Sequence, residues 1–469
     1  MRPAWRSYGL PPCGENGPTY NAPMLDIKLI RERPDFARLR LATRGAGDET
    51  RIDELLKFDE QRRRLLAEVE ALKAQRKRES KAMAARVPKL VREDLLAEGA
   101  TEVMAQEFEA RKTVMRALAD RITALDKQAE EAEEARTQLM LRLPNLPHES
   151  VPVGKSAEDN RVVRLHGEKP AFAFAPKSHV ELCESLGLVD FKRAASLSGS
   201  GFVLYTNWGA KLERALIQFM LDLHTSEHSY TEVSPPFMVG PQCLEGVGQF
   251  PKFADQYYAV QEGLDASTLG KLYLIPTAET PVANIHREEI LKESELPIRY
   301  CAYTPCFRGE AGAAGVGTRG MIRVHQFDKV ELIGIVKPEN SYEEQEKMVT
   351  CAERVLQLLG LHYRVVLLCT GDMGFASAKT YDLEVWAPGQ GSYLEVSSVS
   401  NCEDFQARRM SLRFKGASGE NRFPHILNGS GTALARLFVA LVETYQQADG
   451  SLAVPKGLQA YLKTERIQA

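Results

Sequence analysis

The sequence predicts an α+β fold in which an antiparallel β-sheet domain follows an N-terminal antiparallel α-helical coiled-coil arm. The chain has 469 residues, and domains typically hold about 50 to 250 residues, so more than one unit is expected. Residues 51–143 are rich in charged and helix-favouring types and carry a repeating apolar pattern. From residue 170 onward, helical patterns alternate with strand-like runs that lack regular βαβ spacing, which favours a mixed, largely antiparallel sheet.

Composition limits the class of protein. The chain carries 60 Lys and Arg against 63 Asp and Glu, a formal charge of −3, so nucleic-acid binding would have to depend on local charge. Its eight cysteines form no C-x-x-C pair, and none lies near a histidine at zinc-finger spacing. This predicts reduced thiols, a cytoplasmic location and no zinc. No apolar run approaches the roughly 18 to 20 residues that cross a bilayer, so no membrane partner is expected.

The chain divides into four predicted regions. Residues 1–23 contain five prolines and no apolar stretch of the secretory type, so we expect a disordered extension there. Two arginines and a single acid leave organellar targeting open as the alternative for this segment. We expect a helical domain over 24–150, a linker over 151–168 and the β-sheet domain over 169–469.

The helical domain is predicted to contain a hairpin of two long helices. Each stretch places apolar residues at alternating three- and four-residue steps, the spacing of a coiled-coil seam. We expect Pro88 and the Gly99 region to separate the helices, and Arg62 and Arg136 to interrupt the seams. The seam residues are Leu55, Phe58, Leu65, Val69 and Leu72 in the first helix and Met115, Leu118, Ile122, Leu125, Ala129, Ala132 and Leu139 in the second.

The first helix of the hairpin is strongly basic. Between residues 61 and 92 there are 11 basic residues against three acidic ones, a local charge of +8. A solvated coiled-coil face needs charge but not a single sign of charge, and the second helix is acidic around 130–134. Composition alone leaves two interpretations open, a solvated face and a surface that binds a phosphate backbone.

Further elements follow along the chain. Prolines at 144 and 147 end the hairpin because they cannot continue a helix, and 151–167 has the composition of a linker. Helices are expected over 210–224 and 341–359, and a strand over 363–368. An apolar helix over 432–442 carries a single charge, Arg436. A buried unpaired cation is costly, so this arginine should meet either a structural salt bridge or an anionic ligand.

Polar residues flank a glycine-rich loop at 312–317. The chain has no P-loop and no strand-linked G-x-G-x-x-G, so any nucleotide site is of another kind. The flanks 303–310 and 318–327 predict a strand, a mobile loop and a return strand. Because strand side chains alternate, Arg308 and Glu310 should share one face. On the return strand, the residues expected to share a face are Arg323, His325, Phe327, Lys329 and Glu331.

Such a row of side chains is too polar for a core and has the chemistry of an ATP pocket. A guanidinium clamps phosphate or carboxylate, a carboxylate accepts from an exocyclic amine, and an aromatic ring stacks on a purine. The segments Phe307-Arg308-Gly309-Glu310 and Arg323-Val324-His325-Gln326-Phe327 resemble motif 2 of class II aminoacyl-tRNA synthetases, specifically of the seryl-tRNA synthetase family. The resemblance covers about 24–461 and continues in order through 277–279, 372–375, 379–386, 400–409 and 427–431.

The resemblance also covers the other two motifs of the class. Pro235-Pro236 resembles motif 1, which implies a homodimer, and Arg436 matches the motif 3 arginine. The implied fold is a class II synthetase catalytic domain built on an antiparallel β-sheet. Some positions depart from the family pattern: Gly309 replaces a frequent serine, Val399 a frequent cysteine, and 432–435 differ from the usual residues.

The resemblance implies a role for each matching residue. Arg308 and Arg436 are the implied catalytic residues. Implied ATP-binding residues are Arg308, Gly309, Glu310, Arg323, Val324, Phe327, Glu395, Val396, Ser397, Ser398 and Arg436. Implied serine-binding residues are Thr277, Ala278, Glu279, Arg308, Glu331, Asn428 and Ser430. Mg²⁺ bound with ATP is implied at Glu395 and Ser398, and tRNA at Arg63, Arg76 and Lys77.

Two points about the segment 395–398 follow from strand geometry. Glu395 and Ser398 are three residues apart and cannot share a face of a regular strand, so a bulge or strand end is expected between them. For Ser397, structural hydrogen bonding is the alternative to ligand contact.

The implied activity is that of a serine–tRNA ligase. It would activate L-serine with ATP and transfer it to tRNA(Ser), and to tRNA(Sec) where the host has one. Two rivals are a ligase that charges a carrier protein with a small amino acid, and a non-catalytic coiled-coil scaffold derived from a synthetase. The long basic arm disfavours the first rival. The presence of Arg308, Glu310, Glu395 and Arg436 disfavours the second.

Overall fold

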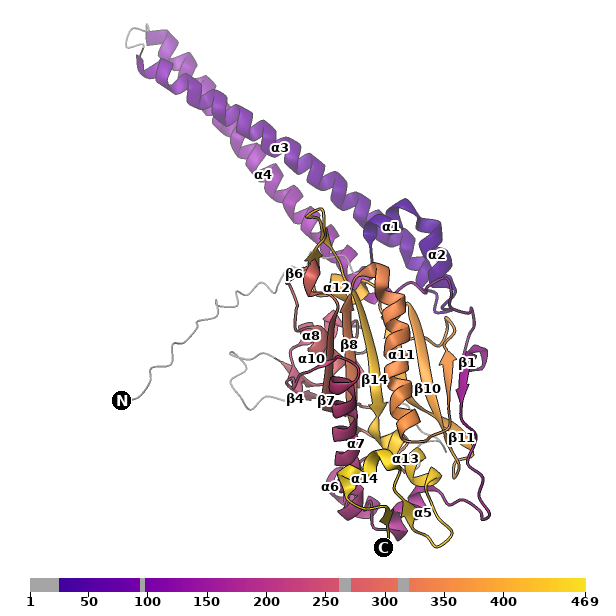
Figure 1. Ribbon diagram of the computed structural model, residues 1–469. Coiled ribbons are helices and arrows are strands. Elements are labelled where there is room, and N and C mark those ends of the chain that lie inside the picture. The colour runs from indigo at the N-terminus through magenta and orange to yellow at the C-terminus, as the bar shows by residue number, and fades with distance from the viewer. Residues whose placement is uncertain (1–24, 93–97, 261–270, 311–319) are drawn as a thin grey trace, which may run out of the picture.

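The computed structural model describes residues 25–92, 98–260, 271–310 and 320–469, and a long helical hairpin projects from a β-sheet body (Figure 1). Side chains are described at these positions except 83–92, 98–105, 107 and 108. The predicted extension at 1–23 and the glycine-rich loop at 312–317 lie outside the described residues. None of the described helices combines the length and the apolar character that crossing a membrane requires.

The described α-helices are α1 (Ile27–Glu32), α2 (Pro34–Ala42), α3 (Ile52–Arg92), α4 (Glu98–Arg142), α5 (His179–Ser185), α6 (Phe191–Ser198), α7 (Asn207–Ser226), α8 (Pro241–Gly246), α10 (Glu279–Ala283), α11 (Ser341–Leu358), α12 (Phe405–Arg409), α13 (Leu434–Thr444) and α14 (Lys456–Leu462). The described strands are β1 (Arg161–His166), β2 (Thr231–Glu232), β3 (Met238–Val239), β4 (Ala259–Val260), β5 (Leu272–Leu274), β6 (Ile290–Lys292), β7 (Ile298–Phe307), β8 (Gln326–Val336), β9 (Tyr363–Leu367), β10 (Lys379–Ala387), β11 (Ser392–Asn401), β12 (Arg413–Lys415), β13 (Asn421–Arg422), β14 (His425–Ala433), β15 (Leu452–Ala453) and β16 (Arg466–Ile467).

The predicted helical hairpin is confirmed as α3 packed along α4. Leu65 and Val69 of α3 are buried against Ile122, Leu125 and Ala129 of α4, which forms the predicted apolar seam. The two helices are separated between residues 92 and 98, which lies between the two expected markers, although Pro88 itself belongs to α3 and Gly99 to α4. Pro88 removes one backbone hydrogen bond from a helix of 41 residues, and the remaining ladder carries the helix past it.

A buried polar layer replaces part of the predicted seam near the base of the hairpin. Asp59, not Phe58, faces α4 and is only 1% exposed. Its carboxylate lies 3.1 Å from the guanidinium groups of Arg136, Arg31 and Arg63. Similarly, Met140 is buried at the position expected for Leu139. A helix of 3.6 residues per turn drifts against a 3.5-residue repeat, which moves the seam by one residue.

The Asp59 layer should contribute measurably to the stability of the arm. Asp59→Asn keeps the side-chain volume but removes the charge shared by three arginines, so we expect the free energy of unfolding to fall by about 2 kcal/mol. Thermal melting and hydrogen exchange of the α3 amides would measure the loss. Asp120→Asn, at an exposed position on α4, is the matched control and should change neither. Equal effects of the two variants would contradict a stabilising role for the layer.

The central sheet has the strand order β1-β9-β10-β11-β14-β8-β7-β2. Its neighbouring strands pair antiparallel, apart from β2, which runs parallel to β7. This confirms the predicted α+β class with a largely antiparallel sheet. The helices expected over 210–224 and 341–359 correspond to α7 and α11, and the expected strand corresponds to β9.

The segment predicted as a linker contributes an edge strand. Residues 161–166 form β1, which pairs antiparallel with β9. All six side chains of β1 are exposed, so its sequence carries no alternation of buried and exposed positions. Backbone pairing, together with the ion pairs of Arg164 with Glu346 and Glu353, places this strand on the sheet, and no pattern of buried side chains predicts it.

Helices α7, α11 and α13 cover one face of the sheet, and the short helices α10 and α12 pack on part of the opposite face, which also holds the pocket. Apolar side chains of α7, α11 and α13 form the main core with the strands behind them. Helix α13 begins at Leu434, two residues later than expected, because Thr432 and Ala433 still pair with β8 as the end of β14. Arg436 therefore lies in the first turn of α13, close to the sheet.

Two arginines, Arg44 and Arg409, tie the base of the arm to the sheet domain. Arg44, just after α2, donates to the carbonyls of Met373, Gly374 and Ser377. Burial lowers the pKa of Arg44 to about 10, so the side chain is still a cation at neutral pH. The three carbonyl oxygens accept its hydrogen bonds. Arg409 of α12 donates to the carbonyl of Leu141, at the end of α4.

Candidate active site

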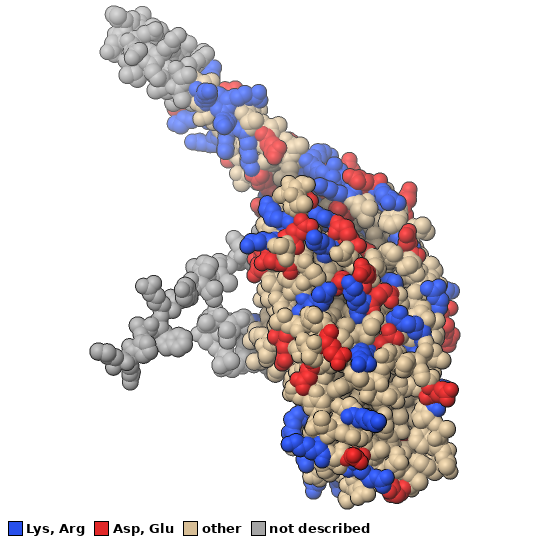
Figure 2. Space-filling view, in the orientation of Figure 1, with Lys and Arg blue, Asp and Glu red and all other residues tan. Residues whose placement is uncertain are grey.

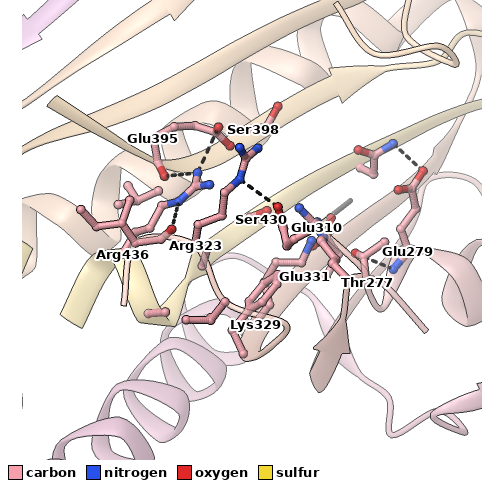
Figure 3. A pocket seen from close by; sticks show the side chains of 18 of the residues that line it. Thr277, Glu279, Glu310, Arg323, Lys329, Glu331, Glu395, Ser398, Ser430 and Arg436 are labelled. Atoms are coloured by element: carbon pink, nitrogen blue, oxygen red, sulfur yellow. Dashed lines mark hydrogen bonds and ion pairs between the residues drawn. The ribbon is translucent and has the colours of Figure 1, made fainter. Parts of the chain in front are cut away.

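One pocket of about 250 Å³ opens on the sheet face opposite the main helices, and Figure 3 shows its side chains converging from several strands. It gathers the predicted site residues of the sheet domain, apart from Ala278, Gly309 and Ser397. The predicted residues that line it are Thr277, Glu279, Arg308, Glu310, Arg323, Val324, Phe327, Glu331, Glu395, Val396, Ser398, Asn428, Ser430 and Arg436.

Strand β8 supplies the centre of the pocket through simple alternation. Phe327, Lys329 and Glu331 face the cavity, while Val330 and Leu332 point into the main core. The expected continuation of this face to His325 was wrong, because β8 begins at Gln326 and the backbone before it is not a strand. The ring of His325 instead lies 5.3 Å from the ring of Phe202. Arg323, also before the strand, still reaches the pocket and pairs with Glu310 at 2.8 Å.

Two arginines far apart in sequence meet at this pocket. Arg308 follows β7, its Nε lies 3.4 Å from the carbonyl oxygen of Pro276, and its guanidinium lies 5.1 Å from the Phe327 ring centroid. Arg436 donates to the carbonyl of Ile322 at 3.1 Å and to the Glu395 carboxylate at 3.1 Å. Arg436 is thus both ion-paired and open to the cavity. Two cations on one cavity favour an anionic ligand such as a polyphosphate.

Carboxylates gather at the other end of the pocket. Glu331 is 3% exposed and pairs with Lys329 at 2.7 Å. Glu279 begins α10, and burial, reinforced by the nearby charge of Glu331, raises its pKa to about 7. Its Oε1 accepts hydrogen bonds from Gln406 at 2.7 Å and from Asn428 at 3.0 Å. Two buried carboxylates suit a small ligand that donates hydrogen bonds from an ammonium and a hydroxyl group.

The expected bulge between Glu395 and Ser398 is present. On β11, Ser397 pairs with Leu383 and Glu395 pairs with Glu384, which leaves Val396 as the extra residue. The bulge turns both Glu395 and Ser398 toward the pocket.

The same corner has the donor set that Mg²⁺ prefers. Glu395 offers a carboxylate and Ser398 a hydroxyl group, both hard oxygen ligands. Asp382 lies opposite Ser398 on β10, and its buried Oδ1 has no hydrogen-bond partner in the described part of the chain. An unpaired buried oxygen beside two further oxygen donors fits a cation bound together with a phosphate ligand.

The three predicted residues that do not line the pocket have structural contacts. The Ser397 hydroxyl donates to the carbonyl of Ser430 at 2.5 Å, which agrees with the structural alternative for this serine. Ala278 is fully buried in a small cluster with Val282. The amide of Gly309 donates to the carbonyl of Gln256, and a Cβ at Gly309 would lie 3.0 Å from that oxygen. A serine at position 309 would therefore require a local shift.

Several residues of the site were not assigned from the sequence. Strand alternation predicted that Lys329 faces the pocket, and it does. The sequence did not predict that Lys329 forms an ion pair with Glu331. Gln249, Ile322, Ala433 and Ala435 also line the cavity. They lie in loops or at element ends, where no periodicity indicates the direction of a side chain.

The predicted tRNA-binding residues lie on α3 of the arm. Arg63, Arg76 and Lys77 are exposed, although Arg63 also pairs with Asp59. Figure 2 shows Lys and Arg side chains gathered on the outer part of the arm. Helices α3 and α4 project away from the sheet domain that holds the pocket (Figure 1).

Known protein families match both the helical arm and the sheet domain that holds the pocket. Residues 24–147 match the family model of the seryl-tRNA synthetase N-terminal domain, and residues 261–445 match that of the class II tRNA synthetase core domain (G, H, P, S and T). A serine–tRNA ligase of Akkermansia muciniphila is 51% identical over 445 residues, which is 95% of this chain and 99% of the relative.

Solved structures of the same type superpose along most of the chain. Seryl-tRNA synthetase of Pyrococcus horikoshii, complexed with ATP, has a TM-score of 0.84 and 39% identity, covering 94% of this chain and 99% of its own. The cytoplasmic serine–tRNA ligase of Naegleria fowleri, in complex with AMP, has a TM-score of 0.81 and 30% identity, covering 95% and 98%. With its basic helical arm, its antiparallel sheet and its two converging arginines, the chain belongs to the seryl-tRNA synthetase family of class II aminoacyl-tRNA synthetases.

Proposed function

We propose that the protein is a serine–tRNA ligase that activates L-serine with ATP and transfers it to tRNA(Ser). The observation that carries this proposal is a single pocket lined both by the guanidinium groups of Arg308 and Arg436 and by the carboxylates of Glu279 and Glu331. The cations suit the phosphates of ATP, and the carboxylates suit the ammonium and hydroxyl groups of serine.

ATP would bind across the sheet with its phosphates between the arginines. Arg308 would hold the α-phosphate together with the serine carboxylate, and Arg436 the outer phosphates. Phe327 would stack on the adenine ring, while Glu310 accepts from its amino group and the Val324 backbone adds a further contact. The Arg323–Glu310 ion pair holds the Glu310 carboxylate in the pocket.

Serine would occupy the carboxylate end of the pocket. Thr277, Glu279, Glu331 and Ser430 would enclose it, and each offers an oxygen that accepts from its ammonium or hydroxyl group. If alanine bound in place of serine, the oxygen that accepts from the serine hydroxyl group would be buried without a donor. This cost makes the site discriminate against amino acids that lack a hydroxyl group.

Activation needs positioning and charge neutralisation rather than a covalent enzyme intermediate. A serine carboxylate oxygen attacks the α-phosphorus in line, a new phosphorus–oxygen bond forms, and the bond to pyrophosphate breaks. Arg308 and Arg436 neutralise the charge that develops on the phosphates. Glu395 and Ser398 would hold Mg²⁺, which supplies further neutralisation when bound. The terminal ribose 3′-hydroxyl of tRNA then attacks the seryl carbonyl and releases AMP.

The arm would bind tRNA by charge and shape. The exposed basic side chains of α3 would contact the phosphate backbone of the long variable arm of tRNA(Ser). Three further predictions remain untested: a homodimer formed through α7 and the Pro235-Pro236 segment, the use of tRNA(Sec), and a cytoplasmic location.

An assay in two steps tests the proposal against both rivals. Serine-dependent ATP–pyrophosphate exchange followed by transfer of serine to tRNA(Ser) is expected. Exchange with transfer to a carrier protein alone would favour the carrier-charging ligase. Absence of exchange with any amino acid, in folded protein with Mg²⁺ and ATP, would favour the non-catalytic scaffold.

The pKa of Glu279 predicts how serine activation depends on pH. Burial and Glu331 raise that pKa to about 7, and only the ionised carboxylate accepts two hydrogen bonds from serine. The kcat/KM for serine should therefore be level above about pH 7 and fall about tenfold per pH unit below it. Steady-state exchange at saturating ATP measures this profile. Glu279→Gln should lower kcat/KM at every pH and abolish the decrease in kcat/KM below about pH 7, which we call the acid limb of the profile. If the acid limb persists in this variant, it reports the titration of another group.

A further inference from the structure

We propose that Gln406 is a positioning residue that holds the Glu279 carboxylate toward bound serine, an inference that rests on the proposed function. Gln406 lies on the short helix α12 and does not line the pocket, and although it falls within the matching segment 400–409, the resemblance assigned it no role. Its connection to the site comes only from the tertiary structure.

The contacts of Gln406 are those of a donor directed at one carboxylate oxygen. The side chain is fully buried, and its Nε2 lies 2.7 Å from Oε1 of Glu279. The same Nε2 also donates to the carbonyl of Val247 at 3.3 Å. Its own Oε1 is buried and has no hydrogen-bond partner in the described residues. A buried amide oxygen without a donor costs stability. Because the Gln406 amide keeps this orientation despite that cost, we infer that the hydrogen bonds donated by its Nε2 determine the orientation.

A second cavity explains why the carboxylate needs to be held. This cavity, of about 340 Å³, shares Gln249, Glu279 and Asn428 with the first pocket as lining residues. Glu279 thus lies in the partition between two open spaces. Without donors on its Oε1, the carboxylate could turn into the second cavity and away from serine. Gln406 and Asn428 donate to this oxygen from α12 and β14, so the hold comes from two separate elements.

The charged and titratable groups around Glu279 give this role a distinctive readout. Glu331 and Lys329 face it from β8, Arg308 from the end of β7, Tyr257 from the loop before β4, and Cys402 from the end of β11. Burial and Glu331 raise the pKa of Glu279, whereas the hydrogen bond from Gln406 opposes that rise. Removing the donor should therefore raise this pKa and move the acid limb of serine activation to higher pH.

The test compares two substitutions of Gln406 with a matched buried control. Gln406→Met keeps the volume but removes the donor, and Gln406→Glu keeps the shape but places a second carboxyl group beside Glu279. Gln345→Met is the control because Gln345 is also fully buried with an unpaired Oε1, and it donates to the carbonyls of Lys379 and Val399. Serine-dependent exchange of the full-length variants gives KM for serine, KM for ATP and the pH profile.

We expect Gln406→Met to raise KM for serine about tenfold or more, because a hydrogen bond to a charged group is lost, and to leave KM for ATP within about twofold. Its acid limb should lie at higher pH than in the native protein, and that of Gln406→Glu higher still. Gln345→Met should change thermal stability without moving the limb. An unmoved limb in both Gln406 variants, or equal rises in the two KM values, would overturn the proposal. Native protein without serine-dependent exchange would instead overturn the proposed function.

Discussion

Replacing Arg308 with alanine is expected to lower serine-dependent ATP–pyrophosphate exchange by at least about a thousandfold. Arg308 lines the pocket, and in the proposed binding mode it contacts both reacting groups, the α-phosphate and the serine carboxylate. Its loss removes charge neutralisation and alignment together, and each typically contributes several kcal/mol to a transition state. Exchange with saturating serine and ATP, measured on purified protein, gives the size of the loss.

The substitution should leave the protein folded, which makes the result interpretable. In the described residues, the hydrogen bond of the Arg308 side chain to protein is a long one, 3.4 Å to the carbonyl of Pro276. Arg308→Lys keeps the charge without the planar fork and should recover only part of the activity. Arg354→Ala, which removes an arginine from α11 on the helical side of the sheet, is the control. Near-normal exchange by folded Arg308→Ala would disprove the assigned role.

Reversing charge on the arm is expected to separate the two half-reactions. Arg76→Glu combined with Lys77→Glu should reduce tRNA charging about a hundredfold and leave serine-dependent exchange unchanged. Both side chains are exposed on α3, which projects away from the sheet domain that holds the pocket (Figure 1). Each reversal removes one attraction to phosphate and adds one repulsion, and the effect should grow with decreasing salt. Aminoacylation at limiting tRNA and exchange without tRNA measure the two steps.

The structure decides which arm residues make a clean test. Arg63→Glu would also place a negative charge beside Asp59 in the buried polar layer, so its effect on tRNA would combine with a loss of arm stability. Lys192→Glu with Lys463→Glu changes the net charge equally at exposed positions outside the arm and serves as the control. Equal loss of exchange and charging in the Arg76 and Lys77 double variant would refute this division of labour.

Much of the fold was predictable because its signals are local and periodic. The seam of Leu65 and Val69 with Ile122 and Leu125 followed from three- and four-residue spacing, and two-residue alternation placed Phe327 and Glu331 on the pocket side of β8. Where periodicity stops, prediction failed. His325 turns away because the strand has not begun, and β1 carries no side-chain pattern at all.

The sequence by itself determined the family, the helical arm, the antiparallel sheet and the identity of the reactive side chains, because each depends on residue type and short-range spacing. Only the tertiary structure decided which other distant groups meet: Asp59 with three arginines, and Gln406 with Glu279. Gln406 and Glu279 are 127 residues apart in the chain. Contacts of this kind depend on how whole elements pack, and no local pattern encodes them.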